Sequence, residues 1–243
     1  MDLNIGRMPH GPRNSIADVS GVRVGHCTVD DERHKTGVTV ILPCEDDIFR
    51  NKMPAAYHVL NGFGKTTGLM QIGELGTLET PIALTNTLNV GKVWDAMVDI
   101  VVEQCNQDGL EPMSINPVVG ECNDCRINQI QKRAVGTAEV RRAFASATDD
   151  FEEGDVGAGA GTLCYGLKGG IGSASRVIRI GETEYTIGVL VQSNFGATED
   201  FLLNGEAVGA KILDWKQEKD DMAASEEDKG SIMSILATDL PLT

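Results

Sequence analysis

The sequence is poor in aromatic residues, in cationic charge and in long apolar runs. Only 5% of its 243 residues are aromatic, and 21 Lys and Arg stand against 36 Asp and Glu, which gives a formal net charge of −15. A field of that sign repels phosphate backbones and argues against nucleic-acid binding. No apolar run is long enough to span a membrane, and residues 1–13 lack the apolar segment of a signal peptide. We therefore expect a cytoplasmic protein whose partners include neither nucleic acid nor membrane.

Residues that could hold a metal are also scarce. Cys122 and Cys125 have C-x-x-C spacing, but a structural zinc site needs a second Cys/His pair. The four histidines lie upstream, singly and without ligand spacing. Six cysteines in a cytoplasmic chain of this size are expected to stay reduced. The sequence predicts no metal site.

Two glycine-rich stretches resemble nucleotide-binding motifs but lack essential positions. Gly64-Lys65-Thr66 matches the end of a phosphate-binding loop, whereas Val59 occupies the place of that motif's first glycine. Residues 157–161 read G-x-G-x-G without the third glycine of a dinucleotide fingerprint or an acidic residue to bind a ribose. Close packing of backbone on backbone explains these glycines better than nucleotide binding does.

Hydrophobic periodicity predicts helices and strands in separate blocks. Residues 90–106 repeat apolar side chains with helical spacing, and a second helix is expected from Thr137, as N-cap, to residue 147. A short helix should follow residue 68. Strands are expected within 14–42 and over 162–167, 175–180 and 185–192, the last two joined by a hairpin at 181–184. This block order favours an α+β fold over a doubly wound sheet.

The end of the chain changes character abruptly. Residues 215–230 are highly charged with few apolar anchors, which predicts a solvated connector. Residues 231–238 are then apolar and indicate a buried strand. No internal repeat interrupts residues 1–243, so we expect a single domain.

The junction between connector and strand, Gly230-Ser231, suits self-cleavage, although a Gly-Ser pair before a strand is also common in proteins that do not cleave themselves. A serine hydroxyl that attacks the preceding carbonyl converts the peptide to an ester, and water then releases a new N-terminal serine. Glycine before the serine permits a strained backbone at low steric cost. The freed α-amine, with an ordinary pKa of roughly 7.7–8.0, can activate the hydroxyl without a Ser-His-Asp triad.

Several long stretches, in collinear order, resemble the L-aminopeptidase/D-esterase family, which includes β-peptidyl aminopeptidases. The region around Gly230-Ser231 looks like the family's processing site. The stretches that carry the resemblance are residues 14–26, 36–43, 58–68, 74–88, 157–161, 168–176, 188–196 and 230–242.

The resemblance implies a layered α/β sandwich like that of N-terminal-nucleophile hydrolases, cut into two associated subunits. Residues 1–230 match the large α subunit and residues 231–243 the start of the β subunit. The implied partners are a small peptide, amide or ester substrate, the protein's own β subunit after cleavage, and further copies in a homo-oligomer. The implied reaction removes an N-terminal residue through an acyl-enzyme, with no metal or cofactor.

Residue roles carry over for Ser231 and Asn194, and Asn123 is a further site candidate where this sequence departs from the family pattern. Ser231 matches the nucleophile, which also performs cleavage after Gly230, and Asn194 matches the asparagine that donates to the oxyanion. Some members have a tyrosine near Asn123; the asparagine here could still donate a hydrogen bond.

Two alternatives stay open. A related architecture in ornithine acetyltransferases performs acyl transfer with a threonine nucleophile, against which Ser231 argues. The family's β subunit also continues well past the nucleophile, with a supporting serine and acidic residue, whereas this chain stops at Thr243. A chain truncated after the first strand of the β subunit would be an inactive scaffold or binding subunit. The sequence does not distinguish α- from β-amino acid substrates.

Overall fold

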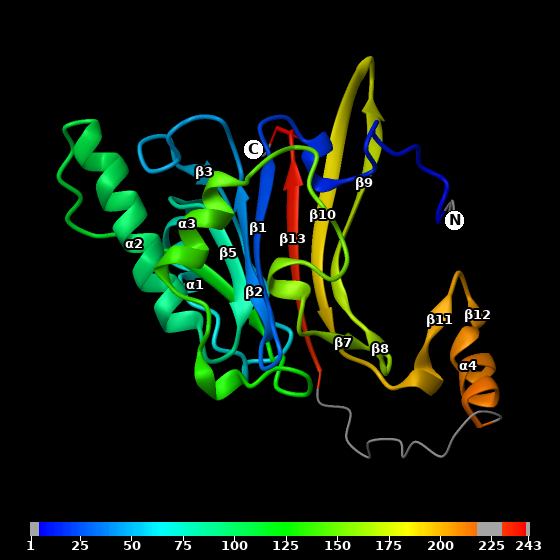
Figure 1. Ribbon diagram of the computed structural model, residues 1–243. Coiled ribbons are helices and arrows are strands. Elements are labelled where there is room, and N and C mark those ends of the chain that lie inside the picture. The colour runs from blue at the N-terminus through cyan, green and yellow to red at the C-terminus, as the bar shows by residue number, and fades with distance from the viewer. Residues whose placement is uncertain (1–4, 218–229, 242–243) are drawn as a thin grey trace.

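The computed structural model describes residues 5–217 and 230–241, and most of its strands form two stacked sheets (Figure 1). The first sheet has the order β1-β2-β5-β6. β2 runs antiparallel to both of its neighbours, β1 and β5, whereas β5 and β6 are parallel and are joined by a helical crossover, as a parallel pair requires. Its strands are β1 (Arg23–Asp30), β2 (Lys35–Leu42), β5 (Ile82–Asn86) and β6 (Val118–Cys122).

The second sheet is antiparallel, with β10 between β13 and β9. β9 and β10 form a long hairpin, and since Ile180 pairs with Thr183, its turn is Gly181-Glu182 rather than the predicted 181–184. β13, which is distant from β10 in the sequence, pairs with the other edge of β10. The strands are β9 (Gly170–Ile180), β10 (Thr183–Asn194) and β13 (Ser231–Thr238).

Two of the helices cover the outer face of the first sheet (Figure 1). The helix predicted over residues 90–106 is confirmed as α2, and its apolar stripe, which includes Val93 and Met97, packs with α3 against Val38 and Val119 of the sheet. None of the helices in the described ranges is long and apolar enough to cross a membrane. The helices are α1 (Leu69–Leu75), α2 (Val90–Gln107), α3 (Thr137–Ala145) and α4 (Val208–Gln217).

A second apolar core fills the space between the two sheets. Val24 and Ile41 of the first sheet meet Ile171 and Leu190 of the second, and all four are almost fully buried. Met233 and Ile235 of β13 pack against the same cluster. The order of layers is therefore helix, sheet, sheet, and the predicted α+β class is confirmed.

The start of α3 differs from the prediction. Gly136, not Thr137, is the N-cap residue, and its backbone N–H donates to the Glu139 carboxylate at 2.9 Å. Thr137 is the first helical residue. The predicted boundary was wrong by one position because the glutamate at the third helical position, rather than the threonine hydroxyl, satisfies the free end.

Residues 162–167, predicted as one strand, fold as a hairpin instead. β7 (Leu163–Cys164) pairs with β8 (Leu167–Lys168) across a turn at Tyr165 and Gly166. The φ angles of these two residues are 52° and 67°, both positive, as a type I′ turn requires. The Tyr165 ring stacks on Phe201 with centroids 4.8 Å apart, which stabilises the unusual tyrosine conformation.

Two further two-stranded sheets lie outside the sandwich. They are formed by β3 (Met53–Pro54) with β4 (Thr77–Leu78), and by β11 (Leu202–Leu203) with β12 (Glu206–Ala207).

The last segments bear out the sequence analysis in part. Most of the predicted connector, residues 218–229, lies outside the described residues, but residues 215–217 belong to α4. The strand at 231–238 is confirmed as β13. It is not fully buried, however, because Ile232 and Leu236 face outward with 43% and 69% of their surface exposed.

Candidate active site

Three strand ends converge on Ser231. It is the first residue of β13, and it pairs with Asn194, the last residue of β10. Asn123 follows the end of β6 in the other sheet. The Ser231 hydroxyl oxygen accepts hydrogen bonds from the Asn194 side-chain nitrogen at 3.0 Å and from the Asn123 backbone nitrogen at 3.4 Å. The fold thus brings together all the predicted catalytic residues.

The orientation of the Asn194 amide is set by its neighbours. Its oxygen accepts from the backbone N–H of Leu163 at 3.0 Å, and its nitrogen also donates to the Asn123 carbonyl at 2.9 Å. Because a backbone N–H can only donate and a carbonyl can only accept, the amide nitrogen must face Ser231. Asn194 is therefore held as a donor to the serine oxygen.

Asn123 contributes through its main chain rather than through its side chain. Its side-chain oxygen accepts from the backbone N–H of Cys125 at 3.0 Å, which forms an Asx turn after β6. The turn points the Asn123 backbone N–H toward Ser231. The side-chain donor considered from the sequence is replaced here by a backbone donor, a contact that does not require an asparagine.

The Cys122 thiol also lies against Ser231 and is completely buried. Burial raises the pKa of this thiol to about 12, although hydrogen bonding with Ser231 opposes the rise. Cys122 is thus a neutral thiol at physiological pH and does not compete as a nucleophile. Cys125 is exposed, all six cysteines are free, and the described residues contain no cluster of side chains able to hold a metal ion.

Two of the four histidines, His26 and His34, have hydrogen-bond or ion-pair partners away from Ser231. His26 is engaged in the first sheet with the Thr39 hydroxyl and the Glu152 carbonyl, and burial lowers its pKa to about 4. His34 pairs with the Asp31 carboxylate. Neither serves as a triad histidine for Ser231.

Glu121 is a candidate site residue that the sequence analysis missed. It lies on β6 two positions before Asn123, which follows the end of that strand. It is only 6% exposed, and its carboxylate accepts hydrogen bonds from the Lys65 backbone N–H at 3.1 Å and from the Thr87 hydroxyl. The signal in the sequence was a single glutamate within the otherwise apolar run 118–122.

A cavity of about 3850 Å³ opens in front of these groups. Ligand pockets usually measure ~300–1,000 Å³, so a small substrate would occupy only part of it. Its walls come from both sheets and from the loop before α1. The lining includes Tyr57, Phe63, Glu121, Asn123, Leu163, Asn194, Gly230, Ser231 and Leu236.

Known proteins match nearly the whole chain. It is 37% identical over 248 residues to beta-peptidyl aminopeptidase BapA from Sphingosinicella xenopeptidilytica, a match that covers 96% of this chain and 61% of that protein. The corresponding protein of Sphingosinicella microcystinivorans is 36% identical, with 96% and 62% covered. The chain thus spans about three fifths of the length of these relatives.

Solved structures agree with the fold. The PH0078 protein from Pyrococcus horikoshii OT3 superposes with a TM-score of 0.89 at 43% identity, over 100% of this chain and 68% of that one. A Burkholderia sp. beta-aminopeptidase gives 0.87 at 40%, covering 99% and 65%.

The l-aminopeptidase d-ala-esterase/amidase from Ochrobactrum anthropi gives a TM-score of 0.84 at 34% identity, over 98% of this chain and 66% of that one. It is described as a prototype for the serine aminopeptidases and a variant of the Ntn hydrolase fold, which confirms the predicted layered architecture. The family model of peptidase family S58 matches residues 14–243. From these matches together, the chain belongs to peptidase family S58.

Proposed function

We propose that the protein is a self-cleaving serine aminopeptidase that releases N-terminal residues from short peptides, amides or esters through an acyl-enzyme on Ser231. One observation carries the proposal. Ser231 directly follows Gly230 in the chain, and its hydroxyl oxygen accepts from two N–H donors, at 3.0 and 3.4 Å. The oxygen that gains negative charge during acyl transfer is the substrate carbonyl oxygen, and fixed neutral donors beside the nucleophile are placed to donate to it.

Self-cleavage would divide the chain between Gly230 and Ser231. The serine oxygen bonds to the Gly230 carbonyl carbon, the peptide C–N bond breaks, and the serine proton passes to the departing nitrogen. Water then hydrolyses the resulting ester, leaving a carboxylate on Gly230 and a free amine on Ser231. A side chain at residue 230 would obstruct this step, because a Cβ there would lie 2.5 Å from the Cβ of Phe195.

In the cleaved enzyme the α-amine of Ser231 would act as the base for its own hydroxyl. The hydroxyl attacks the substrate carbonyl, the amine or alcohol leaves, and water releases the acid. An aminopeptidase must also bind the free amino group of its substrate. Glu121, a buried carboxylate on the cavity wall, supplies a negative charge for that ammonium.

The relatives named beta-peptidyl aminopeptidase support β-peptides among the substrates. We also propose that the two products of cleavage stay associated, as the α subunit (residues 1–230) and the β subunit that begins at Ser231, and that they assemble into a cytoplasmic homo-oligomer. The alternative is an inactive member of the family that serves as an oligomeric scaffold or binding subunit.

The test is intact mass and N-terminal sequencing of protein expressed from the complete gene, beside the variants Ser231→Ala and Ser234→Ala. Ser234 is a matched control because it lies on the same strand with its side chain exposed. We expect a fragment that begins Ser231-Ile232 in the wild type and in Ser234→Ala, and an uncut chain in Ser231→Ala. Hydrolysis of α- and β-aminoacyl p-nitroanilides by the cut protein would then define the substrate. An uncut wild-type chain would support the scaffold alternative.

A further inference from the structure

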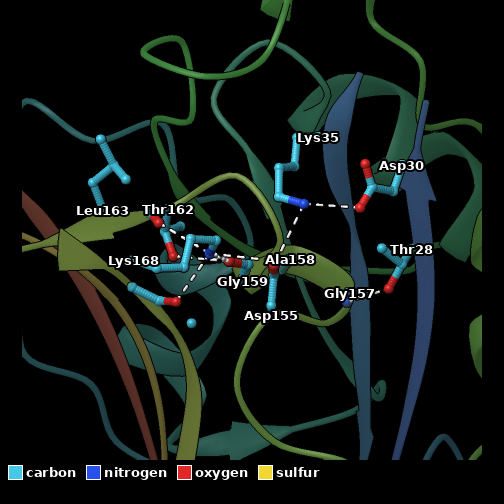
Figure 2. Close-up of polar contacts among 12 residues, drawn as sticks. Thr28, Asp30, Lys35, Asp155, Gly157, Ala158, Gly159, Thr162, Leu163 and Lys168 are labelled. Atoms are coloured by element: carbon cyan, nitrogen blue, oxygen red, sulfur yellow. Dashed lines mark hydrogen bonds and ion pairs between the residues drawn. The ribbon is translucent and has the colours of Figure 1, made fainter. Parts of the chain in front are cut away.

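Lys168 belongs to a polar cluster with Asp155, Gly159 and Thr162 (Figure 2). Its ammonium nitrogen donates to the carbonyls of Gly159 at 2.8 Å, Gly169 at 2.9 Å and Thr162 at 3.1 Å. An ammonium has three N–H donors, so these carbonyls use all of them. The side chain is 32% exposed and also lies 3.3 Å from the Asp155 carboxylate. Lys168 thus ties the glycine-rich segment 157–161 to the β7–β8 hairpin.

One of these carbonyls belongs to a peptide group that reaches the active site. In the peptide group that joins Thr162 to Leu163, the carbonyl oxygen accepts a hydrogen bond from the Lys168 ammonium. The N–H of the same peptide group donates to the Asn194 side-chain oxygen at 3.0 Å. Asn194 in turn donates to the Ser231 oxygen. A continuous line of hydrogen bonds therefore runs from the ammonium to the candidate nucleophile through one peptide unit and one amide.

We propose that Lys168 is a positioning residue of the active site, which holds the Thr162–Leu163 peptide so that the Leu163 N–H keeps the Asn194 amide turned toward Ser231. The proposal rests on the catalytic role proposed above for Ser231 and Asn194. Lys168 does not line the cavity and so acts on the reaction only through these intermediaries.

The positive charge of Lys168 strengthens a hydrogen bond to the Thr162 carbonyl that the hairpin backbone alone does not supply. The Thr162 carbonyl also accepts from the Gly169 backbone N–H at 2.9 Å, so the backbone already sets its approximate place. A charged donor strengthens the bond to that carbonyl and polarises the peptide, which makes the N–H at its other end a better donor. The Leu163 N–H, together with the Asn123 carbonyl that accepts from the amide nitrogen, fixes which end of the Asn194 amide faces Ser231. Without the ammonium, we expect the amide to sample other orientations.

The neighbouring Lys35 is a matched control. Its ammonium pairs with Asp30 at 2.8 Å and lies 3.4 Å from the same Asp155 carboxylate that contacts Lys168 (Figure 2). Its side-chain contacts with Asp30 and Asp155 reach neither the Thr162 carbonyl nor Asn194. Lys35→Met therefore removes an equal charge from the same cluster without touching the line of hydrogen bonds.

The kinetic test compares wild type, Lys168→Met, Lys168→Gln and Lys35→Met, prepared from the complete gene and checked for folding by thermal midpoint. We expect Lys168→Met to lower kcat by about 10- to 100-fold, with KM within about twofold of wild type. The reason is that a misplaced Asn194 donor stabilises the transition state less, whereas substrate binding does not depend on it. Lys168→Gln keeps two donors and should lose less. Lys35→Met should stay within about twofold of wild type.

A double-mutant cycle separates positioning from general stability. In an Asn194→Ala background, Lys168→Met should lower kcat by less than about twofold further, since its intermediary is already gone. Equal losses in both backgrounds, or a normal kcat in folded Lys168→Met, would overturn the proposal.

Crystal structures of the Ser231→Ala protein with and without Lys168→Met give a readout that does not need activity. We expect the Leu163 N to Asn194 oxygen contact to be lost, or Asn194 to occupy two orientations, in the Lys168→Met structure only. An unchanged Asn194 would contradict the proposal. A wild-type enzyme without aminopeptidase activity would instead count against the proposed function, while this structural comparison still decides the role of Lys168.

Discussion

The two sheets of the sandwich differ in how far they are enclosed. All five residues of β6 are buried, and β2 is buried along all but its ends, because α2 and α3 cover one face of the first sheet and the second sheet covers the other. β13 of the second sheet alternates between partly buried and exposed residues. The enclosed sheet contributes most of the buried core, and the open sheet supplies the serine.

This difference places the chemistry at the boundary between the sheets. The enclosed sheet contributes Glu121 and the backbone N–H of Asn123, whereas the open sheet contributes Asn194 and Ser231. A rigid sheet holds a fixed donor well, and an accessible strand admits substrate. Substitutions in the open sheet near Ser231 should therefore affect activity more than stability, and substitutions in the enclosed sheet should do the reverse.

Asn194→Ala should have the largest effect. We expect kcat for amide hydrolysis to fall by about 10²- to 10³-fold, because the variant lacks the side-chain donor to the developing oxyanion. The thermal midpoint should change little. Ser193→Ala is the control, since the preceding side chain on β10 points to the opposite face of the sheet. Equal losses in kcat for the two variants would show that the strand, not the amide, is responsible.

Met97→Ala should have the opposite profile. Met97 on α2 is completely buried against the first sheet, and its truncation should lower the free energy of unfolding by about 2–5 kcal/mol. Denaturant unfolding in the Ser231→Ala background, where the chain stays in one piece, measures the change. Met70→Ala is the control because Met70 is 88% exposed. A fall in kcat per folded Met97→Ala molecule would contradict the division between the sheets.

The enclosed sheet was also the easier one to predict from sequence. The helix at 90–106 and the β-branched run at 37–42 have strong periodic patterns, because packing on the core fixes which side chains must be apolar. The boundary errors came from local chemistry, such as the glutamate that caps α3 and the positive φ angles at Tyr165 and Gly166.

The site itself was predictable only where a side chain carries the role. Ser231 and Asn194 could be proposed from the residues and the resemblance. The backbone donors at Asn123 and Leu163 could not, because any residue type supplies the same N–H and only the stacking of the sheets brings it near Ser231. Glu121 was missed because its burial depends on the parallel pairing of β5 and β6.

His26→Gln should change how stability depends on pH. Burial in the first sheet lowers the pKa of His26 to about 4, below its ordinary value near 6.5. Above pH 6.5 both the folded and unfolded forms are neutral, and as pH falls toward 4 only the unfolded chain gains the proton. The native protein should lose roughly 1–3 kcal/mol across that window, and His26→Gln should not. Parallel curves of unfolding free energy against pH for the two proteins would contradict this.

Leu236→Ala should have the smallest effect and tests whether the open sheet is open in the complete protein. Leu236 is 69% exposed on the outer face of β13, so its truncation should change the free energy of unfolding by less than about 0.5 kcal/mol. Ile235→Ala, on the inner face against the core between the sheets, should cost about 1–2 kcal/mol because a partly buried side chain is removed. Equal costs for the two variants, measured on protein from the complete gene, would mean that the outer face of β13 is covered as fully as the inner one. That result would contradict the contrast between the enclosed and the open sheet.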